Sequence, residues 1–431
     1  MTRLHGPSLR TILLTEALER FAFVGMQSLL VLYLVKFLAQ PGRIEAAWPL
    51  APLADGLGLS GQPLAAAIVG GFSALIYLAP VGGGIITDRW LGQRRAVQLG
   101  GTLLAAGYFL LALVPAWLPG LALLVAGTGL YKGSIVAQVD RLHAANDPRR
   151  ADAFQFFFLA VALASIAAPL LIGSLGERVS WSTGFVASGI AMTGAVIVYG
   201  RGSAAQPPAS APESPTTEGI GAKERQRIAV LLLLLPMIVQ PNFQMSNAYL
   251  VWGDRSFALV AFGARLPASW LLTLDAVVGT AMLLGVTLFW RWLRRHRSEP
   301  DELTKLIIGG GFTLLGTLAL VAAAASADPQ GGGIGLGWPI VFHAFNDIGM
   351  ALILPVLIAL ATRLAPPGWK ATVASLYFLA LFAGGVLASW IGTRFSAMSP
   401  MDFWWLHAAL ALAATLGFAL TRILLWPSAR S

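Results

Sequence analysis

The feature that most limits the fold of this chain is a series of long apolar blocks separated by short polar segments. Each block is about 18–25 residues long, which is the length that an α-helix needs to cross the hydrocarbon core of a bilayer. Hydropathy and helix breakers predict twelve spans, near 11–38, 64–87, 97–115, 119–139, 153–173, 182–199, 227–250, 268–290, 304–325, 337–361, 371–393 and 403–425. The chain is therefore predicted to be an all-α integral membrane protein.

The composition agrees with this prediction. Hydrophobic residues make up 57% of the chain and charged residues 11%, whereas a soluble domain carries about 25% charged residues. The first apolar stretch contains Glu16, Glu19 and Arg20 and lacks a small-residue cleavage site, so we expect a retained helix and not a signal peptide. Cysteine is absent and the five histidines are scattered, so neither disulfides nor a metal site are expected.

The positive charge of the chain is unevenly distributed. With the N-terminus inside, 21 of the 29 Lys and Arg residues fall on the inner side of the predicted spans. Cytoplasmic loops of membrane proteins carry such an excess. We therefore expect both termini in the cytoplasm and a multi-pass protein in the lipid bilayer of the inner (plasma) membrane. The net charge of +9 reflects this topology, so no nucleic-acid partner is expected.

A polar segment divides the predicted spans into six and six. Residues 201–226 are rich in Pro, Ser and Ala, which is typical of a solvated linker without a core. We expect one six-helix bundle over 1–200 and a second over 227–431. This plan resembles the major facilitator superfamily, in which two bundles rock around a central site to give alternating access. The outer loop at 39–62 is assigned no function.

The first predicted helix carries the strongest chemical signal. Glu16, Glu19 and Arg20 are spaced i, i+3 and i+4, so all three project from one face. A charge inside the membrane costs about 2.5–3.5 kcal/mol on insertion scales, so such a cluster needs partners. Two interpretations stay open: a functional cluster in a polar cavity, or an ion-pair network that only holds helices together.

The same residues carry a resemblance to a known family. Glu16-x-x-Glu19-Arg20-Phe21 is similar to the first-helix signature E-x-x-E-R-F-x-Y-Y of the proton-dependent oligopeptide transporter family. Further matches follow in the same order along the chain, at Tyr77–Pro80, Gly83–Gly92, Gly127–Lys132, Pro267–Trp270 and Leu364–Pro366. The chain thus resembles a divergent member of this family, most specifically in helices 1, 2 and 4.

The resemblance implies a proton-coupled mechanism. Glu16 or Glu19 would alternate between a protonated state and an ion pair with Arg20 or Lys132. In the family, that alternation couples proton entry to substrate movement. H⁺ is then the coupling ion, and no other cofactor is expected. Taken alone, Lys132 could instead be a snorkelling residue.

A charged loop follows the second predicted helix. Asp88 and Arg89, with Arg94 and Arg95, match a loop that is found more widely in the superfamily and controls helix contacts on the cytoplasmic side. The resemblance implies a role in gating. A simple positive-inside anchor is the alternative.

The family pattern fails where the resemblance would place the substrate. Tyr77 is retained within the second-helix motif. The family's tyrosine, arginine, tyrosine and acidic residue are replaced, in chain order, by Phe23, Gln27, Phe158 and Met350. These side chains bind charged peptide ends poorly. The site is therefore expected to prefer a less polar or differently charged solute.

Polar residues of the C-terminal half could compensate. His343 lies one turn before Asp347 on the same predicted helix face and could pair with it. An intramembrane acid such as Asp347 or Asp275 is a functional candidate by default, but it can also cap a helix or bind backbone. Gln244 and Asn247, one turn apart, could contact solute or form hydrogen bonds between helices.

These observations favour a proton-coupled symporter of small-molecule solutes, namely small peptides such as di- or tripeptides, or peptide-like compounds. Two alternatives within transport stay open: a symporter of a non-peptide organic solute, and a proton-driven exporter of amphipathic compounds, which would suit the apolar site residues. An integral-membrane enzyme is a further alternative. No nucleophile–base pair is visible in the sequence, however, so no catalytic residue is expected.

Overall fold

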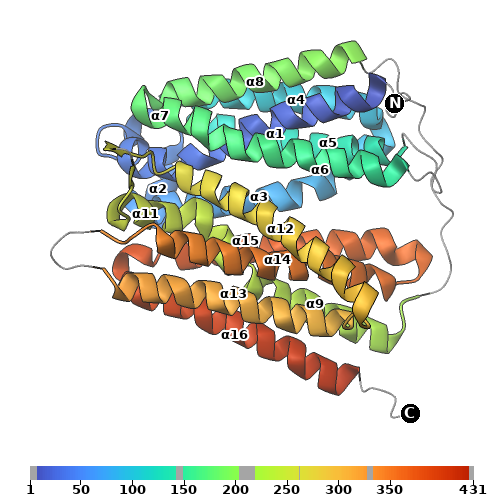
Figure 1. Cartoon of the computed structure of the whole chain (residues 1–431). Helices are drawn as coiled ribbons and strands as arrows, with labels where there is room; N and C mark the ends of the chain where they lie inside the picture. The colour runs from blue at the N-terminus through green and yellow to red at the C-terminus, as the bar shows by residue number, and fades with distance from the viewer. Residues whose placement is uncertain (1–6, 142–148, 203–218, 262, 328–332, 427–431) are drawn as a thin grey trace. The chain divides into compact units, whose positions relative to one another are not determined.

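The computed structural model describes residues 7–141, 149–202, 219–261, 263–327 and 333–426. Most of these residues lie in helices, as the apolar blocks predict, and Figure 1 shows them coloured in chain order. The helices of the first half are α1 (Pro7–Tyr33), α2 (Leu50–Leu57), α3 (Gly61–Ile86), α4 (Gly92–Leu111), α5 (Trp117–Arg141), α6 (Arg149–Ala168), α7 (Ser174–Arg178) and α8 (Trp181–Gly202).

The second half continues in the same manner. Its helices are α9 (Ala222–Ile238), α10 (Gln240–Gln244), α11 (Leu250–Ser256), α12 (Trp270–His296), α13 (Glu302–Ala325), α14 (Gly337–Arg363), α15 (Lys370–Gly392) and α16 (Pro400–Leu425). Four π-helical turns extend or join the longer helices, at Leu34–Leu38, Thr87–Leu91, Pro169–Gly173 and Met245–Tyr249. Such turns are rare and frequently mark functional segments.

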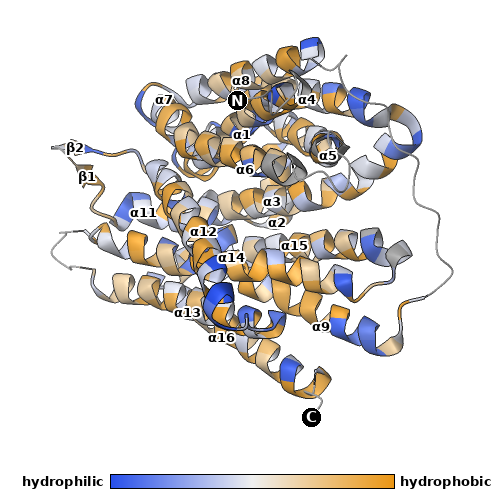
Figure 2. Ribbon diagram, turned by 45° about the vertical axis from the view of Figure 1, so that its right-hand side comes forward, coloured by the Kyte–Doolittle hydropathy of each residue, from blue (hydrophilic) through white to orange (hydrophobic). Residues whose placement is uncertain are grey.

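The number of membrane-crossing helices agrees with the sequence prediction. Among the described residues, 11 helical stretches are long and apolar enough to span a bilayer. One of them, Gly61–Leu111, contains both α3 and α4, joined by the turn Thr87–Leu91. Counting these two separately confirms twelve spans. Figure 2 shows that the helix bodies are mainly hydrophobic and that hydrophilic residues gather toward helix ends.

The helices group into two compact units. One comprises Met1–Ala211 with Leu266–Ala276, and the other comprises Pro212–Arg265 with Val277–Ser431. Helix α12 thus begins in the first unit and continues in the second. Within the first unit α4 packs along α5 and α1 along α8, and within the second α13 packs against both α14 and α16. The expected bundle boundaries stay a prediction, and residues 203–218 of the expected linker lie outside the described residues.

The close approach of α3 to α5 depends on glycine. A Cβ atom added at Gly83 would collide with the carbonyl oxygen of Gly129, and one added at Gly129 would lie 2.7 Å from the carbonyl oxygen of Ala79. Small residues at such positions let membrane helices pack with their backbones nearly in contact. Gly83 thereby fixes the end of α3 that leads into the charged loop at Asp88.

The seventh span is a broken helix formed by α9, α10, the π-helical turn and α11. Asn247 has non-helical dihedrals, φ −128° and ψ −112°. A break inside a membrane leaves backbone groups that neighbouring residues must satisfy. Earlier in the same span, where α9 meets α10, the Gln240 side chain donates hydrogen bonds to the carbonyl oxygens of Pro236 and, at 3.1 Å, Gly384 on α15.

Two loops carry small elements that hydropathy does not reveal. The outer loop at 39–62 contains α2. A two-stranded hairpin pairs β1 (Val260–Ala261) with β2 (Ala264–Arg265), and its turn contains Gly263 at φ +75°. Glycine reaches this left-handed region without steric conflict. The hairpin is too short to alter the fold class, and the prediction of an all-α membrane protein is confirmed.

Candidate functional site

The first unit holds a compact charge cluster on α1. Arg20 donates hydrogen bonds of 2.5 Å from Nε and Nη2 to the two carboxylate oxygens of Glu19. Its Nε also lies 3.6 Å from Oε1 of Glu16, one turn earlier. Glu19 is fully buried and Glu16 is 7% exposed. The spacing read from the sequence therefore does bring these three charges together.

Glu16 differs from Glu19 in its hydrogen bonding. Its Oε2 atom is buried and has no hydrogen-bond partner among the described residues. An ionised oxygen in that position is costly unless a donor or cation satisfies it. Glu16 is thus the carboxylate of the cluster that is better placed to gain or lose a proton, whereas both oxygens of Glu19 are bound by Arg20.

Lys132 joins the cluster from α5 through an aromatic ring. Its Nζ atom lies 4.9 Å from the centre of the Phe23 ring, and the Arg20 guanidinium lies 4.9 Å from the same centre. A ring face attracts cations at this distance. Lys132 forms no ion pair among the described residues, and it shares the Phe23 ring with Arg20 as a contact. With both carboxylates ionised, the four charges balance.

Three tyrosines surround these charges. The phenols of Tyr77 on α3, Tyr108 on α4 and Tyr131 on α5 all lie close enough to interact electrostatically with Arg20. The hydroxyls of Tyr108 and Tyr131 are buried and lack a hydrogen-bond partner among the described residues. Sequence reasoning named Tyr77 alone. Tyr131 could have been found because it precedes Lys132 in the fourth-helix motif, whereas Tyr108 carries no sequence signal.

The other candidates of the first unit are less closely grouped. Gln27 is half-buried on α1, and Asp275 is half-buried near the start of α12. Phe158 is 62% exposed on α6, where it packs edge to face against Phe157. None of these positions is tested by the structure as a solute contact, and they stay predictions.

The candidate gating residues occupy the turn between α3 and α4. Asp88, Arg89, Arg94 and Arg95 are all exposed. None of them forms an ion pair with another residue in the described ranges. Gly92, at φ +70°, ends the π-helical turn and lets the chain enter α4. The exposure is compatible with both gating and a positive-inside anchor.

In the second unit, the amides of the seventh span bind other helices. Gln244 Nε2 donates a 3.0 Å hydrogen bond to the carbonyl oxygen of Ala388 on α15. Of the two interpretations for Gln244, this contact supports a bond between helices. Asn247 is 1% exposed at the break itself. Its position links it to the helix break, and a role in solute binding stays untested.

Two polar residues of α14, His343 and Asp347, contact different neighbours. His343 is fully buried, and its Nε2 lies 3.0 Å from the hydroxyl of Tyr249. Asp347, one turn later, lies against α12, where a Cβ added at Gly279 would be 3.2 Å from Asp347 Oδ2. The His343 and Asp347 donor atoms are within 4.8 Å of one another. Met350 is 6% exposed.

Two polar contacts were missed by sequence reasoning. Asn346 Nδ2 donates a 2.8 Å hydrogen bond to Oδ1 of Asn242. In the first unit, the Glu177 carboxylate accepts hydrogen bonds from the amides of Ala268 at 3.0 Å and Ser269 at 2.8 Å, just before α12 begins. An acid near a helix N-terminus satisfies otherwise unpaired amides. No sequence signal could have found it, because Glu177 is 91 residues from Ala268.

With this arrangement in view, comparison with known proteins is decisive about the family. The model of the Major Facilitator Superfamily matches residues 32–389, which is most of the chain. The chain belongs to the Major Facilitator Superfamily. Membership in this superfamily accounts for the twelve spans and the two units.

Relatives within the superfamily are similar along nearly their whole length. The peptide transporter YePEPT of Yersinia enterocolitica is 28% identical over 95% of this chain and 93% of its own. A di-/tripeptide transporter of Lactococcus lactis subsp. cremoris is 25% identical over 92% of this chain and 90% of its own. Because these relatives are transporters, the prediction that the chain is not an enzyme is confirmed.

Solved structures of superfamily members agree on the fold. A peptide transporter POT in complex with sulfate superposes with a TM-score of 0.82 at 22% identity, covering 96% of this chain and 94% of its own. A POT family transporter in complex with 5-aminolevulinic acid gives 0.82 at 18% identity, covering 98% and 97%. Together with the superfamily match and the relatives named as peptide transporters, this agreement confirms the resemblance to the proton-dependent oligopeptide transporter family that was inferred from the first, second and fourth helices. This superfamily member is a multi-pass membrane transporter.

Proposed function

We propose that this transporter is a proton-coupled symporter that imports di- or tripeptides, or peptide-like solutes, across the plasma membrane by alternating access. The observation that carries the proposal is the balanced cluster of Glu16, Glu19, Arg20 and Lys132. The curated relatives, which are named as peptide transporters, support the class of solute. The excess of Lys and Arg on one side of the spans supports a cytoplasmic location for both termini.

The proton would act by changing the charge balance of the cluster. Glu16, whose Oε2 has no hydrogen-bond partner among the described residues, is the group proposed to accept the proton. Protonation leaves two cations against one carboxylate. Because Arg20 is already bound to Glu19, the uncompensated cation is Lys132, whose Nζ lies 4.9 Å from the centre of the Phe23 ring and forms no ion pair among the described residues.

An uncompensated ammonium in a low-dielectric site attracts an anionic group strongly. The carboxylate of a peptide supplies such a group. Release of the proton from Glu16 would restore the balance and weaken the hold on that carboxylate. Protonation of Glu16 then controls how strongly Lys132 binds the solute. Symport requires this kind of coupling between proton movement and solute movement.

A second candidate, a symporter of a non-peptide organic acid, rests on the residues that depart from the family pattern. Phe23 and Met350 are buried apolar side chains at positions where the family carries tyrosine and an acid. The first unit thus keeps Lys132 as a cation for a carboxylate, while the second unit lacks an acid at the position where the family would bind an amino group. One POT family neighbour is recorded in complex with 5-aminolevulinic acid, which is not a peptide.

The proposal can be tested with the full chain in proteoliposomes. We expect labelled dialanine to accumulate when the outside is more acidic than the inside, and to be lost when a protonophore is added. A thermal-stability screen of di- and tripeptides and small organic acids would identify the preferred solute, because a ligand that binds the folded state raises its melting temperature. Accumulation that is insensitive to the protonophore would reject proton coupling, and movement in the outward direction alone would favour the exporter.

A further inference from the structure

A groove of about 470 Å³ runs along the second unit between α12, α13 and α14. Its lining is almost entirely apolar, and α12 is the least buried of the spanning helices. The side chains that define it are Val286, Phe289 and Leu293 of α12, Ile308 and Phe312 of α13, and Leu352 of α14. The groove lies within the membrane-spanning part of the unit, so its natural occupant is an acyl chain.

One end of this groove is cationic. The lining residues of α12 recur every three or four positions up to Leu293. Arg297 directly follows the last residue of α12, and its amide donates a 2.7 Å hydrogen bond to the Leu293 carbonyl oxygen. On α13, Lys305 lies one turn before the lining residue Ile308, and its Nζ is 5.1 Å from the ring of Trp290, which also lines the groove. Both walls of the groove therefore end in a positive charge.

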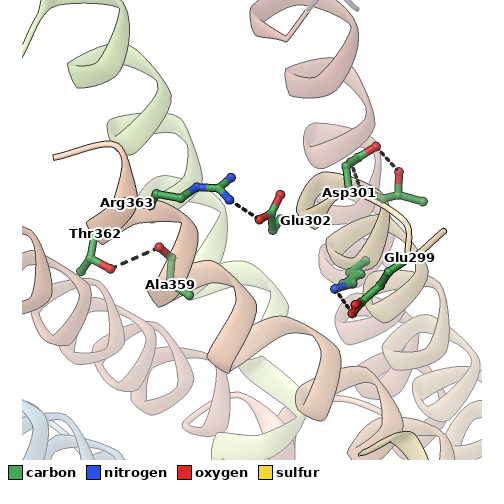
Figure 3. A network of polar contacts seen from close by, with 8 residues as sticks. Glu299, Asp301, Glu302, Ala359, Thr362 and Arg363 are labelled. Atoms are coloured by element: carbon green, nitrogen blue, oxygen red, sulfur yellow. Dashed lines mark hydrogen bonds and ion pairs between the residues drawn. The ribbon is translucent and has the colours of Figure 1, made fainter. Parts of the chain in front are cut away.

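The nearby carboxylates neutralise only part of the positive charge at this end. Glu299 pairs with Lys305 at 2.5 Å and with Arg294 at 3.5 Å. Figure 3 shows Glu299, Asp301 and Glu302 in this region, with the ion pair between Glu302 and Arg363. Asp301 accepts a hydrogen bond from the Thr304 amide and also pairs with Arg422. The exposed Arg291, Arg295 and Arg297 form no ion pair with any residue of the described ranges.

We propose that this groove binds a phospholipid with an anionic headgroup, one acyl chain lying along the apolar walls and the phosphate lying against Arg294, Arg297 and Lys305. Three cations face one carboxylate, Glu299, so an anion improves the charge balance there. Basic pockets between membrane helices recognise anionic lipids in this way. A second groove, in the first unit near Leu53 and Phe72, has no charged lining residue and is not assigned a headgroup preference.

The headgroup part of the proposal can be tested with the full chain purified in detergent. Native mass spectrometry and thermal unfolding would be recorded with dioleoyl-phosphatidylglycerol, with dioleoyl-phosphatidylcholine, and with inorganic phosphate alone. We expect retention of, and stabilisation by, phosphatidylglycerol, and an affinity at least about tenfold lower in the double variant Arg294→Gln/Arg297→Gln, since loss of about 1.4 kcal/mol is tenfold. Arg295→Gln is the matched control, because Arg295 is exposed and lies about 200° around the helix from both Leu293 and Arg297.

Three outcomes would overturn this part. They are equal stabilisation by both lipids, an equal loss of affinity in Arg295→Gln, or stabilisation by phosphate alone, which would indicate an anion site without a lipid. The groove itself is tested by Gly285→Leu. Gly285 lines the groove and has open space at its Cβ, so leucine would fill the acyl-chain path without a backbone clash.

Gly285→Leu should lose bound lipid while keeping the melting temperature of the lipid-free protein. Gly311→Leu, which also meets open space but lies outside the groove lining, should retain lipid. Unchanged lipid retention in Gly285→Leu would refute the acyl-chain site. If Gly285→Leu unfolds, Gly285→Val gives the same comparison with a smaller side chain.

Discussion

Arg20 binds both carboxylate oxygens of Glu19, the residue directly before it, with two hydrogen bonds of 2.5 Å. This pairing occupies one cation and one carboxylate of the cluster and leaves Glu16 and Lys132 as the less constrained members. Two-point pairing of a guanidinium with a carboxylate is among the stronger polar contacts in proteins. The proton-responsive pair is therefore inferred to be Glu16 and Lys132, which lie on different helices.

Replacing Lys132 tests whether this cation binds the solute. Lys132→Ala should lower proton-driven uptake of dialanine by about tenfold or more, since each 1.36 kcal/mol of lost transition-state stabilisation is tenfold. Initial rates in proteoliposomes measure this change. Lys36→Ala, at an exposed lysine near the end of the first span, serves as the control. Normal uptake by Lys132→Ala would favour the snorkelling interpretation.

The hydrogen bond between Tyr249 and His343 should contribute to stability. His343 is fully buried, so Tyr249→Phe removes a partner from a polar group without access to water and should lower the free energy of unfolding by about 1–3 kcal/mol. Thermal or denaturant unfolding in detergent measures it. Tyr108→Phe removes a buried hydroxyl that has no partner among the described residues and should cost much less. Equal losses in the two variants would contradict this account.

The packing of α3 on α5 predicts a sharp difference between adjacent glycines. Gly83→Ala places a methyl group against the Gly129 carbonyl, whereas Gly82→Ala meets open space. We expect a lower melting temperature for Gly83→Ala alone, because overpacking typically costs about 1–3 kcal/mol. If both variants have the melting temperature of the wild type, α3 and α5 do not approach each other as described.

The free energy of unfolding should depend on pH in the acidic range, in part because of Asp301. This residue caps α13, outside the membrane-spanning segment. Burial favours its neutral form, but the hydrogen bonds from Thr304 and the charge of Arg422 lower the pKa of Asp301 overall. Its contribution is therefore complete above an unfolded-state pKa of about 3.9 and is lost as pH falls through the lower folded-state value.

The size of this contribution should be a few tenths of a kcal/mol, because the side chain is 49% exposed and the pair with Arg422 is screened. Asp301→Asn keeps a capping side chain but removes the charge. Unfolding measured from about pH 5 down to pH 3 should show a smaller loss of stability in the variant than in the wild type. Identical slopes would show that the pair contributes nothing.

Hydropathy and charge spacing were enough to predict the spans and the cluster on α1, because both depend on residues that are close in sequence. Glu16, Glu19 and Arg20 lie within one helical turn or so, and the helix period places them together. The superfamily plan followed from the same periodic signal. The family resemblance supplied Lys132, which spacing alone could not have linked to α1.

The rest of the site depends on contacts between distant segments. Tyr249 meets His343 across 94 residues, and Asn346 meets Asn242 across 104. Helix packing decides such pairs, and several packings suit the same hydropathy. The helix break at Asn247 likewise could not be predicted from the sequence, because Asn is tolerated both inside and at the ends of membrane helices.

The most direct test of the central claim is the Glu16→Gln variant in proteoliposomes, where proton-driven accumulation of dialanine is measured beside counterflow exchange without a gradient. Glutamine has nearly the shape of glutamate but cannot gain or lose a proton. The account predicts that accumulation is abolished while counterflow persists, because solute can still cross but no longer draws on the proton gradient. Accumulation at the wild-type level in Glu16→Gln would contradict the assignment of Glu16 as the proton carrier.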